Sequence, residues 1–124
     1  MLTVKETVTR YGKVKLTDEV IATIAAVAAS EVSGVMGMSS KRVTDGIADL
    51  LGRENLTKGV EISSDGDNVF VIVNLIVTYG ARISEVAKEV QQKVKSHIQT
   101  MTGLRVQRVL VNVQGIRIPR ALKS

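Results

Sequence analysis

The sequence contains no cysteine, one proline, one histidine, one phenylalanine and two tyrosines. The absence of cysteine excludes disulfides, thiol catalysis and thiolate metal sites, and it is typical of a cytoplasmic protein. No apolar run approaches the roughly 18 residues that a membrane-spanning helix needs. Residues 1–10 also lack the apolar core of a signal peptide. We therefore expect a cytoplasmic protein with no direct insertion into a membrane.

Catalytic and metal-binding patterns are missing as well. His97 lies beside Val94 at the edge of an apolar stripe, which favours a structural role over that of a general base. The chain has no G-x-S-x-G, G-x-x-x-x-G-K-[ST] or G-x-G-x-x-G motif. Asp65, Asp67 and Asn68 supply oxygen atoms, but no glutamate stands at the twelfth place of a calcium loop, and a hairpin turn explains them. We expect no enzyme, no cofactor and no metal site.

The composition is that of one globular domain. Of 124 residues, 44% are apolar and 23% charged, and the formal net charge is +5. Three of the positive charges lie in the last eight residues, which contain no acid. At an anionic membrane surface they are worth about 3 kcal/mol, too little for stable anchoring, and a solvated tail is the alternative. We divide the chain into an N-terminal arm (1–11), a domain (12–116) and a basic tail (117–124).

One long amphipathic helix, followed at once by a strand, organises the chain. The helix begins near Ser84, and Gly103 ends it in a left-handed conformation. The strand then alternates with period two from Val109 to Val113. The helix carries a stripe of apolar residues at three- and four-residue steps: Ile83, Val86, Ala87, Val90, Val94, Ile98 and Met101. No other helical segment offers so much apolar surface, so the remaining elements must pack against it.

An earlier helix is predicted from Thr17, a good N-cap, with Asp18 and Glu19 in its first turn and Gly34 at its end. Its many alanines allow another backbone to approach closely. Its predicted stripe consists of Val20, Ile21, Ile24, Ala28 and Val32.

The other segments complete an α+β fold. Residues 69–79 are apolar at both parities, so this strand is expected to be central and covered on both faces. Residues 1–11 are either a frayed arm or an edge strand. Further elements are expected as strands at 13–16, 35–38 and 60–63, a short helix at 43–51 and a hairpin turn at 65–68. The order β-α-β-(short α)-β-β-α-β predicts a mostly antiparallel sheet with both main helices on one face.

Such an arrangement leaves one sheet face open. Phe70, Ile72 and Ile76, or their neighbours of opposite parity, would lie on that face. An open apolar face is unusual in a monomer, so we expect self-association or a dedicated partner.

One pattern favours nucleic acid. Gly34 and Gly37 form a G-x-x-G spacing after a helix, and Lys41 and Arg42 follow it. In the KH module such a loop clamps a nucleotide backbone. Here apolar and serine residues precede any second helix, and the few aromatics provide little stacking surface. RNA binding is therefore the alternative to protein binding.

Four segments resemble the alkaline-shock-protein (Gls-type) envelope stress response family of Gram-positive bacteria: GKVKLTDEVIATIAAVAASEVSGVMGM, VTDGIADLLGRENLTKGV, YGARISEVAKEVQQKVKSHIQTMTGLRV and VNVQGI. The resemblance spans Gly12 to Ile116 and keeps the order and spacing of the segments. It implies a small cytoplasmic protein without catalytic activity that acts in cell-envelope homeostasis. Some members self-associate and lie at the inner face of the membrane through a separate membrane-anchored partner.

The family has no active site to transfer to this chain. Tyr79, Gly80 and Arg82 match its motif and are poorly explained by packing, so we nominate them as a partner surface, together with Arg117 and Arg120 of the tail. The leading hypothesis is a non-catalytic, self-associating scaffold in envelope stress. The others are a KH-like RNA-binding module and an accessory subunit that regulates a neighbouring enzyme.

Overall fold

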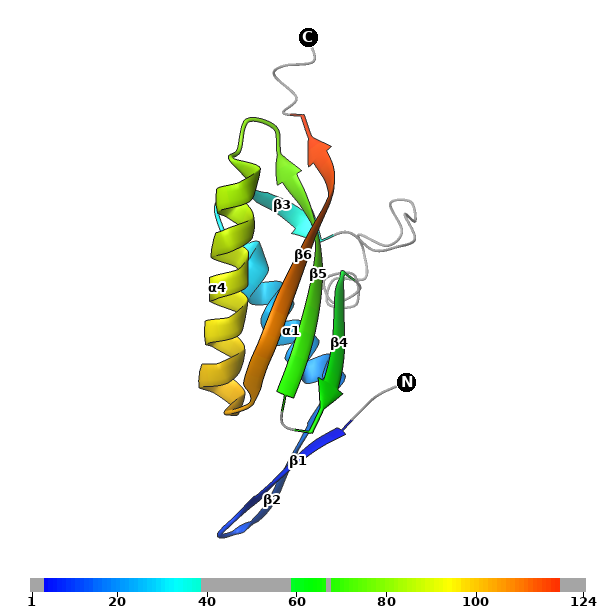
Figure 1. The fold of residues 1–124 in the computed structure, drawn as a ribbon, viewed down its shortest axis with the longest axis vertical. Helices are drawn as coiled ribbons and strands as arrows, with labels where there is room; N and C mark the ends of the chain where they lie inside the picture. The colour runs from blue at the N-terminus through cyan, green and yellow to red at the C-terminus, as the bar shows by residue number, and fades with distance from the viewer. Residues whose placement is uncertain (1–3, 39–58, 67, 119–124) are drawn as a thin grey trace.

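The computed structural model describes residues 4–38, 59–66 and 68–118. Two helices cover one face of a twisted sheet, and a separate hairpin projects from the end of the molecule opposite the last described residues (Figure 1). The sheet strands are β3 (Val35–Met38), β4 (Val60–Asp65), β5 (Asn68–Thr78) and β6 (Arg105–Arg117), and the helices are α1 (Asp18–Ser30) and α4 (Ile83–Thr102). The predicted α+β class is therefore confirmed.

Strand β5 is central, as predicted, because every other described strand of the sheet pairs with it. Strand β6 pairs with one edge of β5 over residues 68–78 and runs parallel to it. The other edge is shared, since β4 pairs antiparallel with residues 68–73 and β3 with residues 75–77. The parallel β6 is the exception in a mostly antiparallel sheet, and helix α4 is the crossover that parallel neighbours require.

Helix α4 packs through one row of side chains. Val86, Val90, Val94 and Ile98 of the predicted stripe are buried, and Gly103 ends the helix at φ +77°. The two ends of the stripe were wrongly assigned to the core. Ile83 is exposed and Met101 is 68% exposed, because both lie in the terminal turns of the helix.

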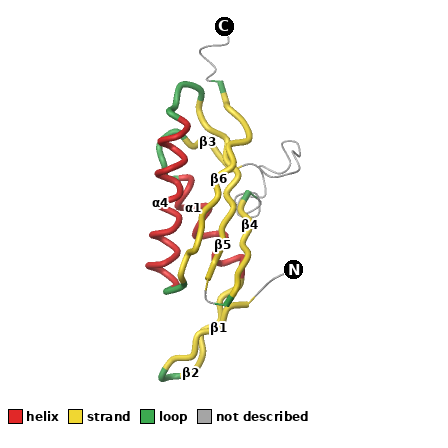
Figure 2. The backbone as a smooth tube through the Cα atoms, viewed as in Figure 1, coloured by secondary structure: helices red, strands yellow, loops and turns green. Residues whose placement is uncertain are grey.

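Helix α1 begins as predicted, with Thr17 Oγ1 accepting the backbone N–H of Val20 at 3.3 Å. It ends at Ser30, before the predicted Gly34, which instead lies in the following turn at φ +100°. Its buried face consists mainly of alanines, and Val20 of the predicted stripe is exposed. Figure 2 shows both helices against the same side of the yellow strands.

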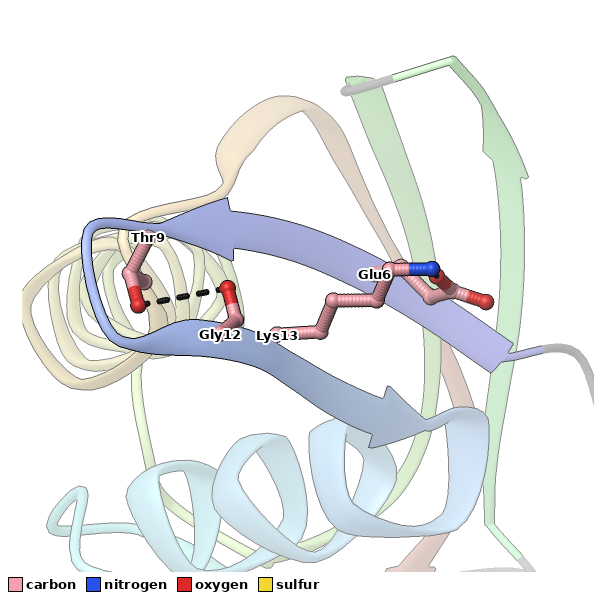
Figure 3. A network of polar contacts seen from close by, with 4 residues as sticks. All are labelled: Glu6, Thr9, Gly12 and Lys13. Carbon is pink, nitrogen blue, oxygen red and sulfur yellow. Dashed lines mark hydrogen bonds and ion pairs between the residues drawn. The ribbon is translucent and has the colours of Figure 1, made fainter.

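The N-terminal residues form a strand, which decides between the two alternatives for this segment. Strands β1 (Val4–Thr9) and β2 (Gly12–Thr17) pair antiparallel as a two-stranded sheet of their own. The turn is held by Thr9 Oγ1, which donates to the Gly12 carbonyl at 3.4 Å. Glu6 and Lys13 extend toward one another across the strands, with 3.8 Å between Oε1 and Nζ (Figure 3). The predicted boundary between residues 11 and 12 falls in this turn.

Two further expectations concern the centre of the chain. The hairpin turn predicted at 65–68 connects β4 to β5. The odd-numbered apolar residues of β5 are buried against the helices, whereas Phe70, Ile72 and Ile76 on the opposite face are only half-buried. Complete cover on both faces was therefore a wrong prediction. The short helix predicted at 43–51 lies outside the described residues.

Candidate interaction surface

The partner residues nominated from the sequence gather at one end of the sheet. Because β5 and β6 are parallel, they finish at the same end, where the Tyr79 N–H donates to the Arg117 carbonyl at 2.9 Å. Gly80 and Arg82 follow in the turn that leads into α4, at the upper end of the sheet in Figure 1. Arg120 lies outside the described residues. The other four nominated residues are thus neighbours along one rim.

The side chains on this rim are presented to solvent. Tyr79 is 59% exposed, and Gly80 adopts φ +97° with no atom within 4 Å of the position a Cβ would take. Glycine is therefore required there by the backbone and not by packing. Arg82 forms an exposed ion pair with Glu85 at 3.7 Å, a kind of contact that contributes little to stability.

Exposed apolar side chains surround these residues. Met36, beside the end of β5 in β3, is 51% exposed, and Ile116 near the end of β6 is 50% exposed. Ile118, just past β6, is exposed as well. We call the set the strand-end surface: Met36, Tyr79, Gly80, Arg82, Ile116, Arg117 and Ile118. An apolar cluster of this kind beside two arginines is typical of a binding surface.

The open face of the sheet is less apolar than predicted. Asn74, on the same face as Ile72 and Ile76, is 2% exposed, and its Nδ2 donates to the Gly59 carbonyl at 3.2 Å. Its Oδ1 accepts from Asn112 Nδ2 at 3.1 Å and from Gln114 Nε2 at 3.2 Å. A satisfied amide network therefore interrupts the apolar residues on this face. No local sequence pattern signals it, because the three amide side chains meet only through strand pairing.

The outer edge of β6 is partly sealed by helix α4. Val106 N–H donates to Gln99 Oε1 at 3.1 Å, and Gln91 Nε2 donates to the Val109 carbonyl at 3.0 Å. Two glutamines of the helix thus occupy hydrogen-bonding positions that a neighbouring strand would use. Within the described parts of the chain, β5 is the only strand that pairs with β6.

The G-x-x-G segment does not form the loop expected of a KH module. The backbone at Gly34 packs closely against α4, because a Cβ added there would lie 2.8 Å from Val86 Cγ2. Gly37 is paired with Ile76 inside β3. Gly34 thus has a structural role and Gly37 lies in a paired strand, so the segment does not have the conformation that the RNA hypothesis required. Lys41 and Arg42 lie outside the described residues.

Other features provide little chemistry. The described residues contain no group of three or more side chains able to hold a metal ion. His97 is half-buried on α4. A cleft of about 740 Å³ lies between the hairpin and the lower turns of the sheet, and Glu6, Asp65, Asn68 and Arg105 are among its lining residues. Among the described helices, none is long and apolar enough to cross a membrane.

Comparison with known proteins places these features in a family. The model of the alkaline shock protein 23 family, described as having a cell envelope-related function, matches residues 6–118. The uncharacterized protein YloU of Bacillus subtilis is 40% identical over 111 residues, which are 89% of this chain and 92% of that protein. The uncharacterized protein Spy1614 of Streptococcus pyogenes shows the same identity and coverage.

Two further comparisons give weaker similarity. The uncharacterized protein YqhY of Bacillus subtilis is 36% identical over 109 residues, which are 88% of this chain and 80% of that protein. A solved zinc form of the MamM CTD is 14% identical with a TM-score of 0.49, over 79% of this chain and 85% of that chain. A structural similarity of this degree says nothing about function.

Proposed function

Because the chain belongs to the alkaline shock protein 23 family, whose function is related to the cell envelope, we propose that it is a non-catalytic scaffold that self-associates and binds a membrane-anchored protein. In this proposal it is a cytoplasmic protein of a Gram-positive bacterium that acts in envelope stress and homeostasis. It reaches the inner face of the membrane only through its partner.

The observation that carries the proposal is the strand-end surface. Tyr79, Ile116 and Ile118 expose apolar area beside Arg117, on a rim built from the ends of paired strands. Aromatic residues and arginine are the side chains most enriched where protein partners make strong contacts. A partner with a mixed apolar and acidic segment would fit this surface.

The non-catalytic part of the proposal rests on the residue types available. The chain has no cysteine and a single histidine, His97, which lies half-buried on the side of α4. A nucleophile activated by a histidine would have to use this one.

The test is membrane recruitment in cells. A double variant, Tyr79→Ser with Arg117→Glu, should move the protein from the membrane fraction to the soluble fraction, because it removes the aromatic anchor and reverses the charge. Met101→Ser is the matched control, since Met101 is similarly exposed but lies at the other end of α4. Cell fractionation with an epitope-tagged chain measures the distribution. Unchanged membrane association of the double variant, at normal abundance, would refute the proposed surface.

A further inference from the structure

The outer edge of β6 has a stretch with which no other described strand pairs, and its position follows from the hydrogen bonds around it. In a strand, the N–H and C=O of one residue point to the same edge, and alternate residues share that edge. Val109 points outward, because its carbonyl accepts from Gln91 of α4. Val111 and Val113 therefore also point outward, while residues 110 and 112 point toward β5.

Two register shifts against β5 bound this stretch. Gln107 is the extra residue of β6 at the first shift, and Gln114 is the extra residue at the second. Beyond the second shift Arg117 points inward, since its carbonyl accepts a backbone N–H just past the end of β5. The open stretch thus consists of Val111 and Val113.

The two halves of this edge differ in how they are covered. Helix α4 runs alongside the first half of β6 and lies away from the second half, as Figures 1 and 2 both show. The first half is closed by the contacts of Gln91 and Gln99. Residues 110–116 contain no charge and no proline, two of the devices that normally protect a sheet edge from pairing with another chain.

We propose that two copies of this chain pair antiparallel through β6, with the two-fold axis at Asn112. In this register Val111 of one copy lies opposite Val113 of its partner, and the reverse holds on the other side of the axis. Each of these two pairs exchanges two N–H···O bonds, because both residues point outward. The four-stranded sheets then form one continuous sheet. The inference rests on the self-association in the proposed function and gives it an interface.

Neighbouring registers fit less well. An axis at Val111 would place Val113 opposite Val109, whose carbonyl is already occupied by Gln91. An axis at Val113 would place Val111 opposite Gly115, which lies beyond the second register shift and points toward β5. Only the axis at Asn112 pairs the two open residues with each other.

The charges also favour a second copy as the occupant. The open stretch is neutral, and the same neutral stretch of a partner matches it without burying a charge. Arg108 and Arg117 flank it, and in this register Arg108 of one copy approaches Arg117 of the other only at the exposed ends of the pairing, where salt screens the repulsion. Added salt should therefore leave the dimer intact or strengthen it, whereas an acidic peptide bound at this edge would be released by salt.

The first experiment removes an outward N–H. Val113→Pro deletes a donor that points away from β5, as edge strands tolerate, whereas Val113→Thr keeps the N–H and a similar shape. Sedimentation equilibrium across protein concentration should show a dimer dissociation constant raised about tenfold or more by Val113→Pro, with little change for Val113→Thr. Equal association of the proline variant and the unmodified chain would overturn the proposal.

The second experiment tests the register and does not depend on the proline variant folding. Asn112 lies opposite its own counterpart in a non-hydrogen-bonded pair, with Cα atoms about 4.5 Å apart, within disulfide range. The chain has no cysteine, so Asn112→Cys introduces the only thiol. Asn74 Oδ1 still accepts from Gln114 in that variant. Mild oxidation should cross-link Asn112→Cys into a covalent dimer on a non-reducing denaturing gel. Gln92→Cys, on the exposed side of α4, should remain without a cross-link although its β6 pairing is intact.

The outcomes separate the two proposals. A chain that is monomeric at every concentration overturns both the β6 pairing and the self-association in the proposed function. A chain that self-associates, but whose Asn112→Cys variant does not cross-link preferentially, overturns the β6 pairing alone. Membrane recruitment through the strand-end surface is measured separately and is unaffected by either result.

Discussion

Helix α1 buries a face made mostly of alanine, whereas helix α4 buries a single row of valine and isoleucine. The two helices contact each other and cover the same side of the sheet. In α1 the larger residues Val20 and Val27 are exposed, and the buried residues are Ile21, Ala22, Ala25, Ala26, Ala28 and Ala29. In α4 every buried residue is a valine or an isoleucine.

The difference follows from what surrounds each helix. Helix α1 contacts α4 and also β3, β4 and β5, so it has neighbours on several sides and small side chains let them approach closely. Helix α4 packs on α1 and β6, and large side chains fill the space along one narrow stripe. A stripe of large apolar residues therefore identifies the buried face of α4. In α1 the same criterion is partly wrong, because the buried face consists mostly of alanine.

The largest expected effect on stability comes from shortening a buried side chain of α4. Ile98→Ala should lower the free energy of unfolding by about 2–5 kcal/mol, because Ile98 is fully buried and its loss leaves a cavity. Urea denaturation followed by circular dichroism measures the change. Met101→Ala, one turn later and 68% exposed, is the control and should change stability far less. Equal losses of stability at both positions would show that the buried valine and isoleucine residues of α4 are not part of the core.

A smaller effect is expected from enlarging the alanine face. Ala26→Val should destabilise the protein by about 1–3 kcal/mol, because Ala26 has no exposed surface and added methyl groups need space that close packing does not leave. The same denaturation experiment measures it. A gain in stability would mean that α1 borders a void, and the proposed reason for its alanines would fail.

The smallest effect on stability is expected at the adjacent position of α1, where a valine is replaced by alanine. Val27→Ala should alter the free energy of unfolding by no more than about 0.5 kcal/mol, since Val27 is 41% exposed and alanine is the better helix former. Together with Ala26→Val it forms a matched pair at adjacent positions. A loss larger than that for Ala26→Val would reverse the assigned faces of α1.

Much of the fold was predictable because local patterns determine it. The period of α4, the left-handed Gly103 and the turn at 65–68 each depend on a few neighbouring residues. The parallel direction of β6 was not predicted, although the long helix between β5 and β6 was a usable signal for a crossover. The amide network at Asn74 had no local signal, since its partners are 38 and 40 residues away in sequence.

The candidate surface was predictable only in part. Tyr79, Gly80 and Arg82 were nominated through a family motif, and the structure brings Arg117 beside them through strand pairing. The apolar neighbours in β3 and β6 were not nominated, because their exposure depends on where the adjacent strands stop. The G-x-x-G spacing suggested an RNA-binding loop that the structure does not contain. Gly34 is required instead because it packs closely against α4, an element distant in sequence.

Among the described residues, strand β5 is the only strand through which β3, β4 and β6 are joined. No other pairing among the described strands of this sheet holds two of them together, so there is no route around β5. Losing β5 would separate its three partners at once, and the sheet should therefore open as a single cooperative unit. Among the described strands, β1 and β2 pair only with each other, and the hairpin joins the rest of the molecule where Leu16 packs against the core and Thr17 caps α1. We therefore expect the outer turn of the hairpin, between residues 9 and 12, to open without opening the sheet.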